Sequence, residues 1–182
     1  MQVTPLPLDG ALLITPRIFA DDRGFFVETF SAQRYRDAGI TEEFVQDNLS
    51  FSRRGVLRGL HGDARMSKLV QVLAGEAYDV IVDLRPESAT YLHWYAVRLD
   101  ARDRAQLYVP RGFLHGFLAL TGEVLFAYKQ SALYDPACEI GVAWNDPDLA
   151  IPWPLDGPPI LSPKDAANPP LRAVVTNLAS RR

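Results

Sequence analysis

The sequence predicts an all-β protein of the β-barrel or β-sandwich type, and three observations support this prediction. Apolar runs of four to eight residues follow one another between residues 56 and 128. Glycine, proline or aspartate separates most of these runs, as expected for turns between strands. The last forty residues contain eight prolines, which cannot donate the backbone hydrogen bonds of a central strand or a long helix.

The chain begins with segments that are typical of short strands. The run Ala11–Ile14 is apolar, Arg17–Ala20 is typical of a second short strand, and Asp21–Gly24 predicts the turn that follows it. The segment Phe25–Phe30 mixes aromatic residues with one carboxylate, Glu28. It is compatible with a strand that lines a ligand pocket and equally with a strand that packs on the core.

One short helix is predicted over Ser31–Gly39, where a serine can cap the first turn and a glycine can end the last. The polar segment Gln46–Ser50 has no helical period, and a strand-rich core is expected over about residues 45–130. The tail, about residues 145–182, is expected to wrap the barrel, because side chains such as Trp153 are too apolar for a disordered linker. Strands of the core are predicted at Val56–Leu60, Lys68–Leu73, Ala77–Leu84, Tyr95–Leu99, Gln106–Val109, Phe113–Leu120 and Val124–Tyr128.

Composition and charge limit the functions that the chain can have. With 182 residues and 48% hydrophobic residues, the chain can bury one core, so residues 1–182 are expected to form a single domain. Its 19 basic and 22 acidic residues give a net charge of -3 and no basic face, so binding to nucleic acid is not expected. The single Cys138 cannot form an intrachain disulfide, and the sequence contains neither a membrane span nor a signal peptide pattern. These features favour a soluble, cytoplasmic protein.

The stretch Arg58–Lys68, RGLHGDARMSK, places one imidazole between two cations. Histidine titrates nearest neutral pH, so His61 is the best candidate for a proton acceptor, while Arg58 and Lys68 could hold an anionic substrate or a developing oxyanion. A surface turn that happens to carry charges is the alternative. Arg58 and His61 lie three positions apart, so a regular strand would turn them to opposite faces, and Gly59 is where a β-bulge could correct this.

A second motif, Pro110–His115, matches the pattern P-x-G-x-x-H, the second half-motif of the cupin β-barrels. The first half-motif of metal-binding cupins is H-x-H followed by a glutamate. This chain has His61-Gly62-Asp63 and then Lys68, which would repel a divalent cation. The predicted fold is therefore a cupin-type jelly-roll β-barrel or sandwich with a short N-terminal helix and a proline-rich C-terminal tail, and no metal site is expected.

Two residues outside these motifs could complete a site for proton transfer. Tyr128 ends a predicted strand, where its phenol could donate a proton, although a tyrosine that only packs at the barrel rim is equally compatible. Asp165 in the tail could fix the tautomer of an imidazole and raise its basicity. A base on one face of a substrate and a phenol on the other would remove a proton next to a carbonyl and return one from the opposite side, which inverts a stereocentre. Lys68, Arg58 or His115 would then stabilise the enolate oxygen.

The chain resembles the dTDP-4-dehydrorhamnose 3,5-epimerases, the deoxysugar epimerase branch of the cupins. The resemblance extends from about Ile14 to Asp165 and rests on the order and spacing of several motifs. It implies inversion of C3, C5 or both in a nucleotide-linked 4-keto-6-deoxy sugar, as in the conversion of dTDP-4-keto-6-deoxyglucose to dTDP-4-keto-rhamnose. The motifs are Asp22–Phe26 with Glu28, Gln46–Ser50, Gly55–His61, Lys68–Val70, Asp79–Arg85, Pro110–Phe117, Tyr128-Lys129 and Leu161–Asp165.

The resemblance also implies roles for individual residues. The family's catalytic base, supporting carboxylate and proton donor match His61, Asp165 and Tyr128, and the aromatic that stacks on the thymine ring matches Tyr134. Members need no metal or organic cofactor and usually form homodimers, in which the segment that matches Arg23–Glu28 reaches the partner's site. The family's other substrate contacts match Arg23, Glu28, Gln46, Asn48, Arg58, Lys68, His115, Glu139 and Lys164.

One departure from the family pattern leaves the substrate open. Many members have Tyr-Gln after the active-site histidine and a longer loop before the lysine, whereas Gly62–Ser67 is short here and carries an acid. This shorter form is similar to that of members that act on other nucleotide-linked 4-keto sugars. The alternatives are a related epimerase that acts on another sugar or at one centre only, a metal-dependent cupin enzyme, and a sugar-binding barrel without catalysis.

Overall fold

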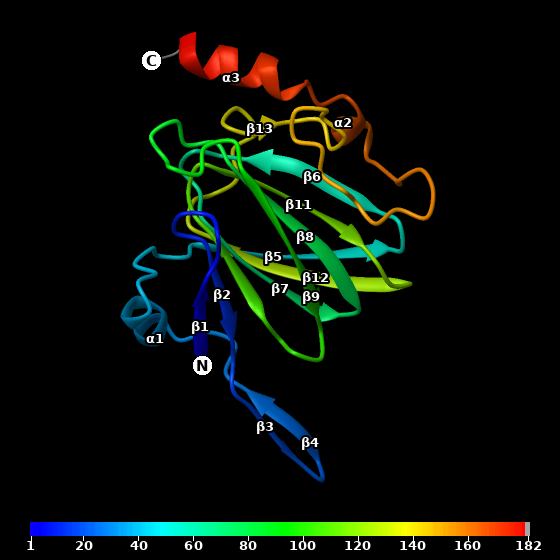
Figure 1. Cartoon of the computed structure of the whole chain (residues 1–182). Helices are drawn as coiled ribbons and strands as arrows, with labels where there is room; N and C mark the ends of the chain where they lie inside the picture. Colours follow the sequence, from blue (N-terminus) through cyan, green and yellow to red (C-terminus); the bar gives the residue numbers. More distant parts are fainter. Residues whose placement is uncertain (181–182) are drawn as a thin grey trace.

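The computed structural model describes residues 1–180 and shows two antiparallel β-sheets that face one another (Figure 1). All seven strands predicted between residues 56 and 128 are present, and the chain has the predicted all-β jelly-roll fold. The larger sheet consists, in spatial order, of β1 (Gln2–Pro5), β2 (Leu12–Thr15), β10 (Gln106–Val109), β7 (Lys68–Ala74), β12 (Glu123–Gln130) and β5 (Gln46–Arg53). The smaller sheet consists of β13 (Ile140–Gly141), β6 (Leu57–Gly62), β11 (Phe113–Ala119), β8 (Glu76–Asp83) and β9 (Trp94–Asp100).

Alternate side chains of the facing strands fill the space between the two sheets. Val70 and Val72 of β7, Ile81 of β8, Leu107 of β10 and Phe126 of β12 are fully buried there. A strand places every second side chain on the same face, so the period of two in these runs produces one continuous core. Each such side chain contributes roughly 1.5–3 kcal/mol when it is removed from water.

β5 was predicted only as a polar segment without a helical period. Along this strand the polar side chains point inward and the apolar ones point outward. Asn48 and Ser50 are partly buried, while Leu49 and Phe51 are exposed. A strand that turns its polar side chains inward does not line an apolar core. β5 therefore lies where the space between the sheets becomes polar.

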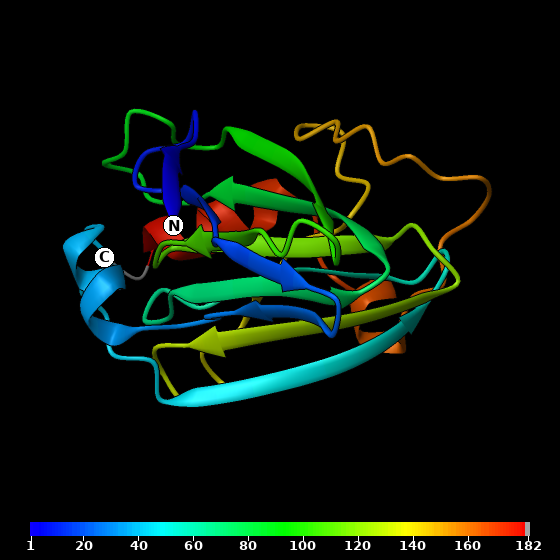
Figure 2. The ribbon, with the colours of Figure 1, turned by 90° about the horizontal axis from the view of Figure 1, so that it is seen from below.

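Over the described residues, the C-terminal tail packs on the outer face of the smaller sheet. Trp153 lies edge-on to Tyr78 of β8, with the ring centroids 5.9 Å apart. The indole N–H of Trp94 donates to the carbonyl of Leu149 at 2.8 Å. In Figure 2 the orange part of the tail runs past the ends of the strands. The tail thus closes the smaller sheet from outside.

The tail contains two helices, α2 (Pro163–Ala166) and α3 (Leu171–Ser180). α3 contradicts the expectation of a tail without a long helix. Pro169 and Pro170 directly precede it, and proline is well tolerated at the start of a helix, where its missing N–H has no partner to lose. Within residues 1–180, no helix is long and apolar enough to cross a membrane.

The N-terminal region contains the one helix that the sequence predicted there, α1 (Ala32–Asp37). Ser31 occupies the position before it, but its side chain makes no capping hydrogen bond, and its carbonyl accepts from the Tyr35 N–H at 3.0 Å. Tyr35 packs with Ile14 of β2 in a small buried cluster. β1, which was not predicted, pairs with β2.

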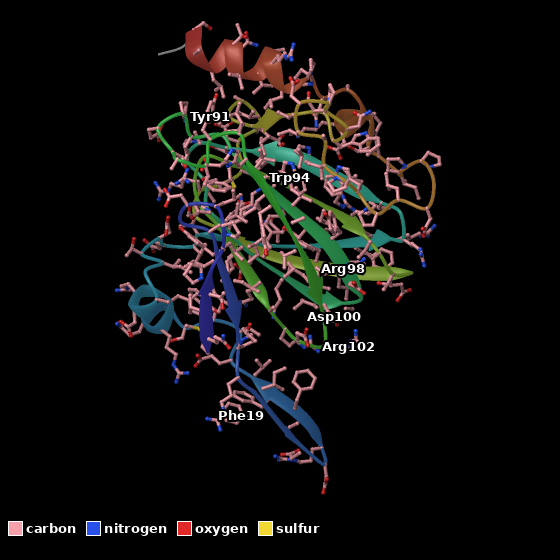
Figure 3. The ribbon with its side chains drawn as sticks, in the orientation of Figure 1. Phe19, Tyr91, Trp94, Arg98, Asp100 and Arg102 are labelled. Carbon is pink, nitrogen blue, oxygen red and sulfur yellow. The ribbon has the colours of Figure 1, made fainter. Side chains whose placement is uncertain are left out.

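β3 (Ile18–Asp21) and β4 (Gly24–Val27) form a two-stranded hairpin that projects away from both sheets (Figure 1). Phe19 lies on this projecting hairpin (Figure 3), and Phe26 is 70% exposed. The strand expected over Phe25–Phe30 therefore ends at Val27, and its Phe25 and Phe26 stay exposed. Phe30, beyond the end of the strand, packs on Tyr35 in the small buried cluster.

Candidate active site

A cavity of about 260 Å³ lies between the two sheets, beside the polar inner face of β5. Strands from both sheets and helix α2 contribute to it. The three residues with a predicted catalytic role and four of the predicted substrate contacts line this one cavity. The complete lining is Ser50, Arg58, His61, Lys68, His115, Gly116, Phe117, Phe126, Tyr128, Ser162, Lys164 and Asp165.

A β-bulge in β6 brings Arg58 and His61 into the same cavity. Arg58 is opposite Phe117 of β11 and His61 is opposite His115, so three steps along β6 match two steps along β11. Gly59, in the bulge, has a φ of 120°, a conformation that glycine adopts readily. A Cβ at this position would also lie 2.6 Å from the Cα of Gly116 on β11. The bulge expected at Gly59 is therefore confirmed.

The imidazole of His61 is bound by a carboxylate of the tail. Its Nε2 is hydrogen-bonded to Oδ1 of Asp165, whose side chain is 5% exposed. Ser162 caps α2, because its Oγ accepts from the Asp165 backbone N–H at 3.0 Å. Burial raises the pKa of Asp165, but the hydrogen bonds and charge of His61 and the bond to Ser162 outweigh it, so the pKa lies below its ordinary value. Asp165 is therefore ionised at neutral pH and can orient His61.

Tyr128 reaches the cavity from the larger sheet. On β12 it lies between Asn48 of β5 and Val70 of β7. Burial raises the pKa of its phenol, the nearby charge of Arg58 lowers it, and that of Glu139 raises it again, with a net shift upward. The phenol consequently keeps its proton at neutral pH, as a proton donor requires.

Two cations, Arg58 and Lys68, line the cavity together. The Nε of Arg58 donates to Ser52 Oγ at 3.0 Å, and one terminal nitrogen donates to the carbonyl of Phe51 at 3.0 Å. β5 thus holds the guanidinium in place. Burial lowers the pKa of the Lys68 ammonium, and nearby carboxylates oppose this change.

A second His–Asp pair lies deeper in the structure. His115 on β11 is directly opposite His61, and its Nε2 lies 3.1 and 2.9 Å from the two carboxylate oxygens of Asp79 on β8. Asp79 is 0% exposed and His115 is 8% exposed. Burial raises the pKa of Asp79, while the charges of His115 and Lys68 oppose the rise. Asp79 was not among the predicted site residues, although a carboxylate inside an apolar strand is a signal of a special role.

Five predicted substrate contacts form a cluster that meets the cavity at Lys164. We call it the rim cluster, and it consists of Gln46, Asn48, Tyr134, Glu139 and Lys164. Lys164 is hydrogen-bonded to Glu139 and its ammonium lies 5.9 Å from the ring centroid of Tyr134. The phenol of Tyr134 donates to Glu139 at 3.3 Å, and its backbone N–H donates to Gln46 at 3.2 Å. Gln46 in turn donates to the side-chain carbonyl of Asn48 at 2.9 Å. Five predicted contacts are therefore linked to one another.

Two predicted contacts, Arg23 and Glu28, do not line the cavity of their own chain. Arg23 lies in the turn of the projecting hairpin and is hydrogen-bonded to Asp21. Glu28 lies 3.3 Å from Arg34 of α1 in an exposed ion pair. If these residues contact substrate, they must do so in another copy of the chain.

Known proteins that are similar to this chain were found by sequence and by structure. The family model described as dTDP-4-dehydrorhamnose 3,5-epimerase matches residues 5–173. A dTDP-4-dehydrorhamnose 3,5-epimerase from Methanothermobacter thermautotrophicus is 47% identical over 169 residues, which are 91% of this chain and 91% of that protein. The chain belongs to the dTDP-4-dehydrorhamnose 3,5-epimerase family.

Relatives within this epimerase family differ in their described activities. The dTDP-6-deoxy-D-glucose-3,5-epimerase of Legionella pneumophila, solved in complex with dTDP-4-keto-L-rhamnose, is 45% identical with a TM-score of 0.93, and the match covers 97% of this chain and 96% of that chain. A protein of Streptomyces niveus named dTDP-4-dehydrorhamnose 3-epimerase is 43% identical over 169 residues, covering 91% of this chain and 81% of that protein. Membership of the family therefore does not decide how many centres react.

The loop that departs from the family pattern, Gly62–Ser67, turns its acid away from the cavity. Asp63 is buried and accepts from the Arg65 side chain at 2.7 and 3.0 Å. It lines a separate, mostly apolar cavity of about 530 Å³ that extends to α3 and holds none of the predicted site residues. The sequence His61-Gly62-Asp63 therefore does not place a carboxylate beside the imidazole of His61. In the described part of the chain, no three His, Cys, Asp or Glu residues are grouped to hold a metal ion.

Proposed function

We propose that the chain is a cofactor-independent epimerase that inverts C3, C5 or both of a nucleotide-linked 4-keto-6-deoxy sugar. One observation carries this proposal: His61 of the smaller sheet and Tyr128 of the larger sheet line the same cavity. A sugar ring between the two sheets would present one face to the imidazole and the other face to the phenol. A base and an acid on opposite faces of a ring are what inversion of a carbon centre requires.

The proposed reaction uses the acidity of carbons that flank a ketone. C3 and C5 both neighbour the C4 carbonyl, so removal of either proton moves charge onto the C4 oxygen. His61, oriented by Asp165, is the proposed base, and the cations Lys68 and Arg58 are the proposed stabilisers of the enolate oxygen. Tyr128 is proposed to return a proton to the opposite face. No redox step is needed, because the substrate and the product are isomers.

The rim cluster is proposed to bind the nucleotide. Tyr134 is 53% exposed and offers a flat ring on which a base can stack, and Lys164 can meet a phosphate. The side-chain nitrogen of Asn48 is buried and has no hydrogen-bond partner among residues 1–180. A buried donor without a partner is costly, typically about 1–3 kcal/mol, so this amide is well suited to a substrate oxygen.

The test is proton NMR of the wild-type enzyme in deuterated water with dTDP-4-keto-6-deoxyglucose. We expect deuterium to replace the protons at C3, C5 or both, and an epimerised product to accumulate. A barrel that only binds the sugar would change its spectrum without any exchange, and that result would overturn the proposal.

A narrower form of this proposal is an epimerase that acts at one centre only, and the alternative to it is an epimerase that acts on another nucleotide sugar. The short Gly62–Ser67 loop favours this alternative. The same NMR experiment distinguishes the candidates, because exchange at C3 alone and exchange at both carbons give different spectra. Repeating the experiment with the same sugar linked to other nucleoside diphosphates identifies the nucleotide base that the enzyme prefers.

We propose further that the functional unit is a homodimer. The hairpin carries Phe19, Phe25 and Phe26, and the outer face of the larger sheet carries Leu49 and Phe51, all of them exposed. Monomeric proteins rarely leave this much aromatic surface in water. A second copy that receives the hairpin would cover it and would place Arg23 near the partner's cavity.

Sedimentation and a mixing experiment test the dimer. The wild type should sediment as a dimer, and Phe26→Asp should shift it towards the monomer. Arg23→Ala and His61→Asn should each be nearly inactive alone. Mixed dimers should recover activity, because the cavity with intact His61 receives an intact hairpin from the other copy. A dimer without any recovery would show that Arg23 does not act across the interface.

A cytoplasmic location is also part of the proposal. The nucleotide-linked substrate and the unpaired Cys138 are typical of a reducing compartment. Cell fractionation tests this location, and a protein found outside the cytoplasmic fraction would contradict the proposal.

A further inference from the structure

Asp165 reaches His61 from a helix that is too short to be stable by itself. α2 has four residues, and an isolated helix shorter than about 12–15 residues is marginal in water. The capping bond from the Asp165 backbone N–H to Ser162 Oγ lies within the turn and does not fix the turn against the sheet. The position of the Asp165 carboxylate on His61 therefore depends on contacts that the chain makes before and after α2.

The segment before α2 is bound to the beginning of β6. The backbone N–H of Ile160 donates to the carbonyl of Gly55 at 2.8 Å, and the carbonyl of Ile160 accepts from the N–H of Leu57 at 3.0 Å. These bonds form a short parallel bridge between Ile160 and Val56. This first anchor lies at the end of β6 that is far from His61.

The segment after α2 lies directly on Gly141 of β13. A Cβ at this position would lie 2.8 Å from Cγ of Asn168 and closer still to its Oδ1. The φ of Gly141 is not in the left-handed region, so the backbone conformation does not require a glycine here. The N–H of Ala143 donates to the carbonyl of Pro169 at 2.9 Å and holds the chain against β13. The missing side chain of Gly141 is therefore what lets Asn168 come this close.

This second anchor lies beside the catalytic imidazole. Gly141 is directly opposite His61 in the pairing of β13 with β6. Opposite residues of an antiparallel pair project from the same face of a sheet, so Asn168 packs on the face from which His61 projects. The side-chain nitrogen of Asn168 is buried and has no hydrogen-bond partner within residues 1–180. Packing, and not a hydrogen bond of this nitrogen, therefore holds the side chain in place.

We propose that Gly141 is a positioning residue of the His61–Asp165 pair. Because Gly141 lacks a side chain, the turn that follows α2 closes on β13, and this closure places the carboxylate of Asp165 on Nε2 of His61. The inference rests on the function proposed above, which makes His61 the base. Ile160 fixes the chain before α2, and Gly141 fixes it after α2.

Gly141→Ala should displace α2 and weaken the His61–Asp165 hydrogen bond without removing either residue. A displacement of about 1 Å can lower kcat by up to about 10²-fold, and the loss should not exceed that of Asp165→Asn. kcat is measured at saturating substrate, because Lys164 lies on the same helix and its displacement should raise KM as well. An unchanged kcat in Gly141→Ala would overturn the proposal.

Two double variants separate positioning from a general loss of stability. In Asp165→Asn the carboxylate is already absent, so the addition of Gly141→Ala should lower kcat little further, whereas independent effects would multiply. In Asn168→Ala the obstructing side chain is absent, so the addition of Gly141→Ala should leave kcat close to that of Asn168→Ala. Asn168→Ala itself should lose little stability, since it removes a buried nitrogen without a partner. Multiplied effects in the first pair, or no recovery in the second, would contradict the role of Gly141.

Gly157→Ala is the matched control. Gly157 also lies in the tail, but a Cβ there would have no atom within 4 Å. The same change of residue should therefore leave kcat at the wild-type value. A loss in Gly157→Ala as large as that in Gly141→Ala would show that the tail as a whole is sensitive, and the assignment to Gly141 would fail.

NMR of the His61 ring proton tests the position of Asp165 without turnover. With labelled ring nitrogens, the proton in the bond to Asp165 should be resolved in the wild type, be lost or move upfield in Gly141→Ala, and return in Gly141→Ala/Asn168→Ala. If Gly141→Ala does not fold, the double variant decides, because it should fold and give the wild-type signal. A double variant that lacks the signal or does not fold would overturn the proposal. The signal does not depend on catalysis, so a wild type that failed to exchange substrate protons would refute only the proposed function.

Discussion

The cavity contains two His–Asp pairs, and they differ in their contact with solvent and in the elements that hold them. His61, 23% exposed, is bound to Asp165 of the tail, whereas His115, 8% exposed, is bound to Asp79 of the neighbouring strand. The pKa of Asp165 is lowered by its hydrogen bonds in spite of burial. The pKa of Asp79 is raised by burial in spite of its partner.

This difference shows how one pair of residue types can take two roles. The outer imidazole of His61 is able to exchange a proton with water after each turnover, which a general base must do. The inner imidazole of His115 is held between strands and is better suited to fixed hydrogen bonding. The outer pair is therefore predicted to move protons and the inner pair to stabilise charge.

The largest expected effect is that of removing the outer imidazole. His61→Asn should reduce deuterium exchange into the substrate by at least about 10²–10⁴-fold, the usual contribution of a general base. His93→Asn is the matched control, since His93 is exposed and does not line the cavity. Exchange is measured by NMR in deuterated water. If His61→Asn exchanged substrate protons at the wild-type rate, the outer pair would not be the pair that moves protons.

Tyr128→Phe tests whether the outer pair works with a separate acid. Abstraction should persist, because His61, Lys68 and Arg58 remain, and the protonated imidazole should return the proton mainly to the original face. Inversion should therefore be slower by roughly 10²–10⁴-fold while exchange continues. Both rates are measured on one sample, and Tyr95→Phe serves as the control, since Tyr95 packs against the core and does not line the cavity. An unchanged ratio of inversion to exchange would mean that Tyr128 only packs at the barrel rim.

Asp165→Asn should have a smaller catalytic effect than His61→Asn, because the imidazole remains. The side chain should also affect stability in a pH-dependent way. The lowered pKa of Asp165 means that its ionised form is stabilised by folding. Its contribution is therefore present above the unfolded pKa of about 3.9 and is lost as the pH falls through the folded pKa.

Urea unfolding of wild type and Asp165→Asn at several pH values measures this contribution. The wild type should be the more stable protein at pH 7, and the difference should shrink below about pH 4. A difference that is the same at pH 3 and pH 7 would show that the carboxylate charge is not what stabilises the outer pair.

The two members of the outer pair were predicted through the resemblance to the family, because His61 and Asp165 are 104 positions apart and no local pattern joins them. Gly59 was a local signal, since it marked the bulge that places Arg58 beside His61. Asp79 and His115 are 36 positions apart and meet only through the antiparallel register of β8 and β11. No local pattern reports such a register.

The strands show the same division between local and non-local information. Apolar strands were predicted because their inward residues enter a core, whereas β5 was not, since its inward Asn48 and Ser50 meet a cavity. The direction of the hairpin that carries Arg23 could not be predicted either, because its aromatic side chains are not buried by its own chain. Where function places polar groups inside and apolar groups outside, the alternation of apolar and polar residues no longer predicts which side chains are buried.

The smallest expected effect is that of metal removal, and it bears on both pairs at once. His61 of β6 and His115 of β11 are opposite one another in the strand pairing. Two neighbouring imidazoles could share one metal ion. Each, however, is bound through Nε2 to its own carboxylate, and Lys68 brings a positive charge into the same cavity. We therefore expect activity to survive exhaustive dialysis against a chelator, and elemental analysis to find no stoichiometric transition metal. If turnover were lost and one divalent ion restored it, both histidines would be metal ligands. The outer and inner pairs would then have one shared task, and Lys68 would need a role other than binding the enolate oxygen.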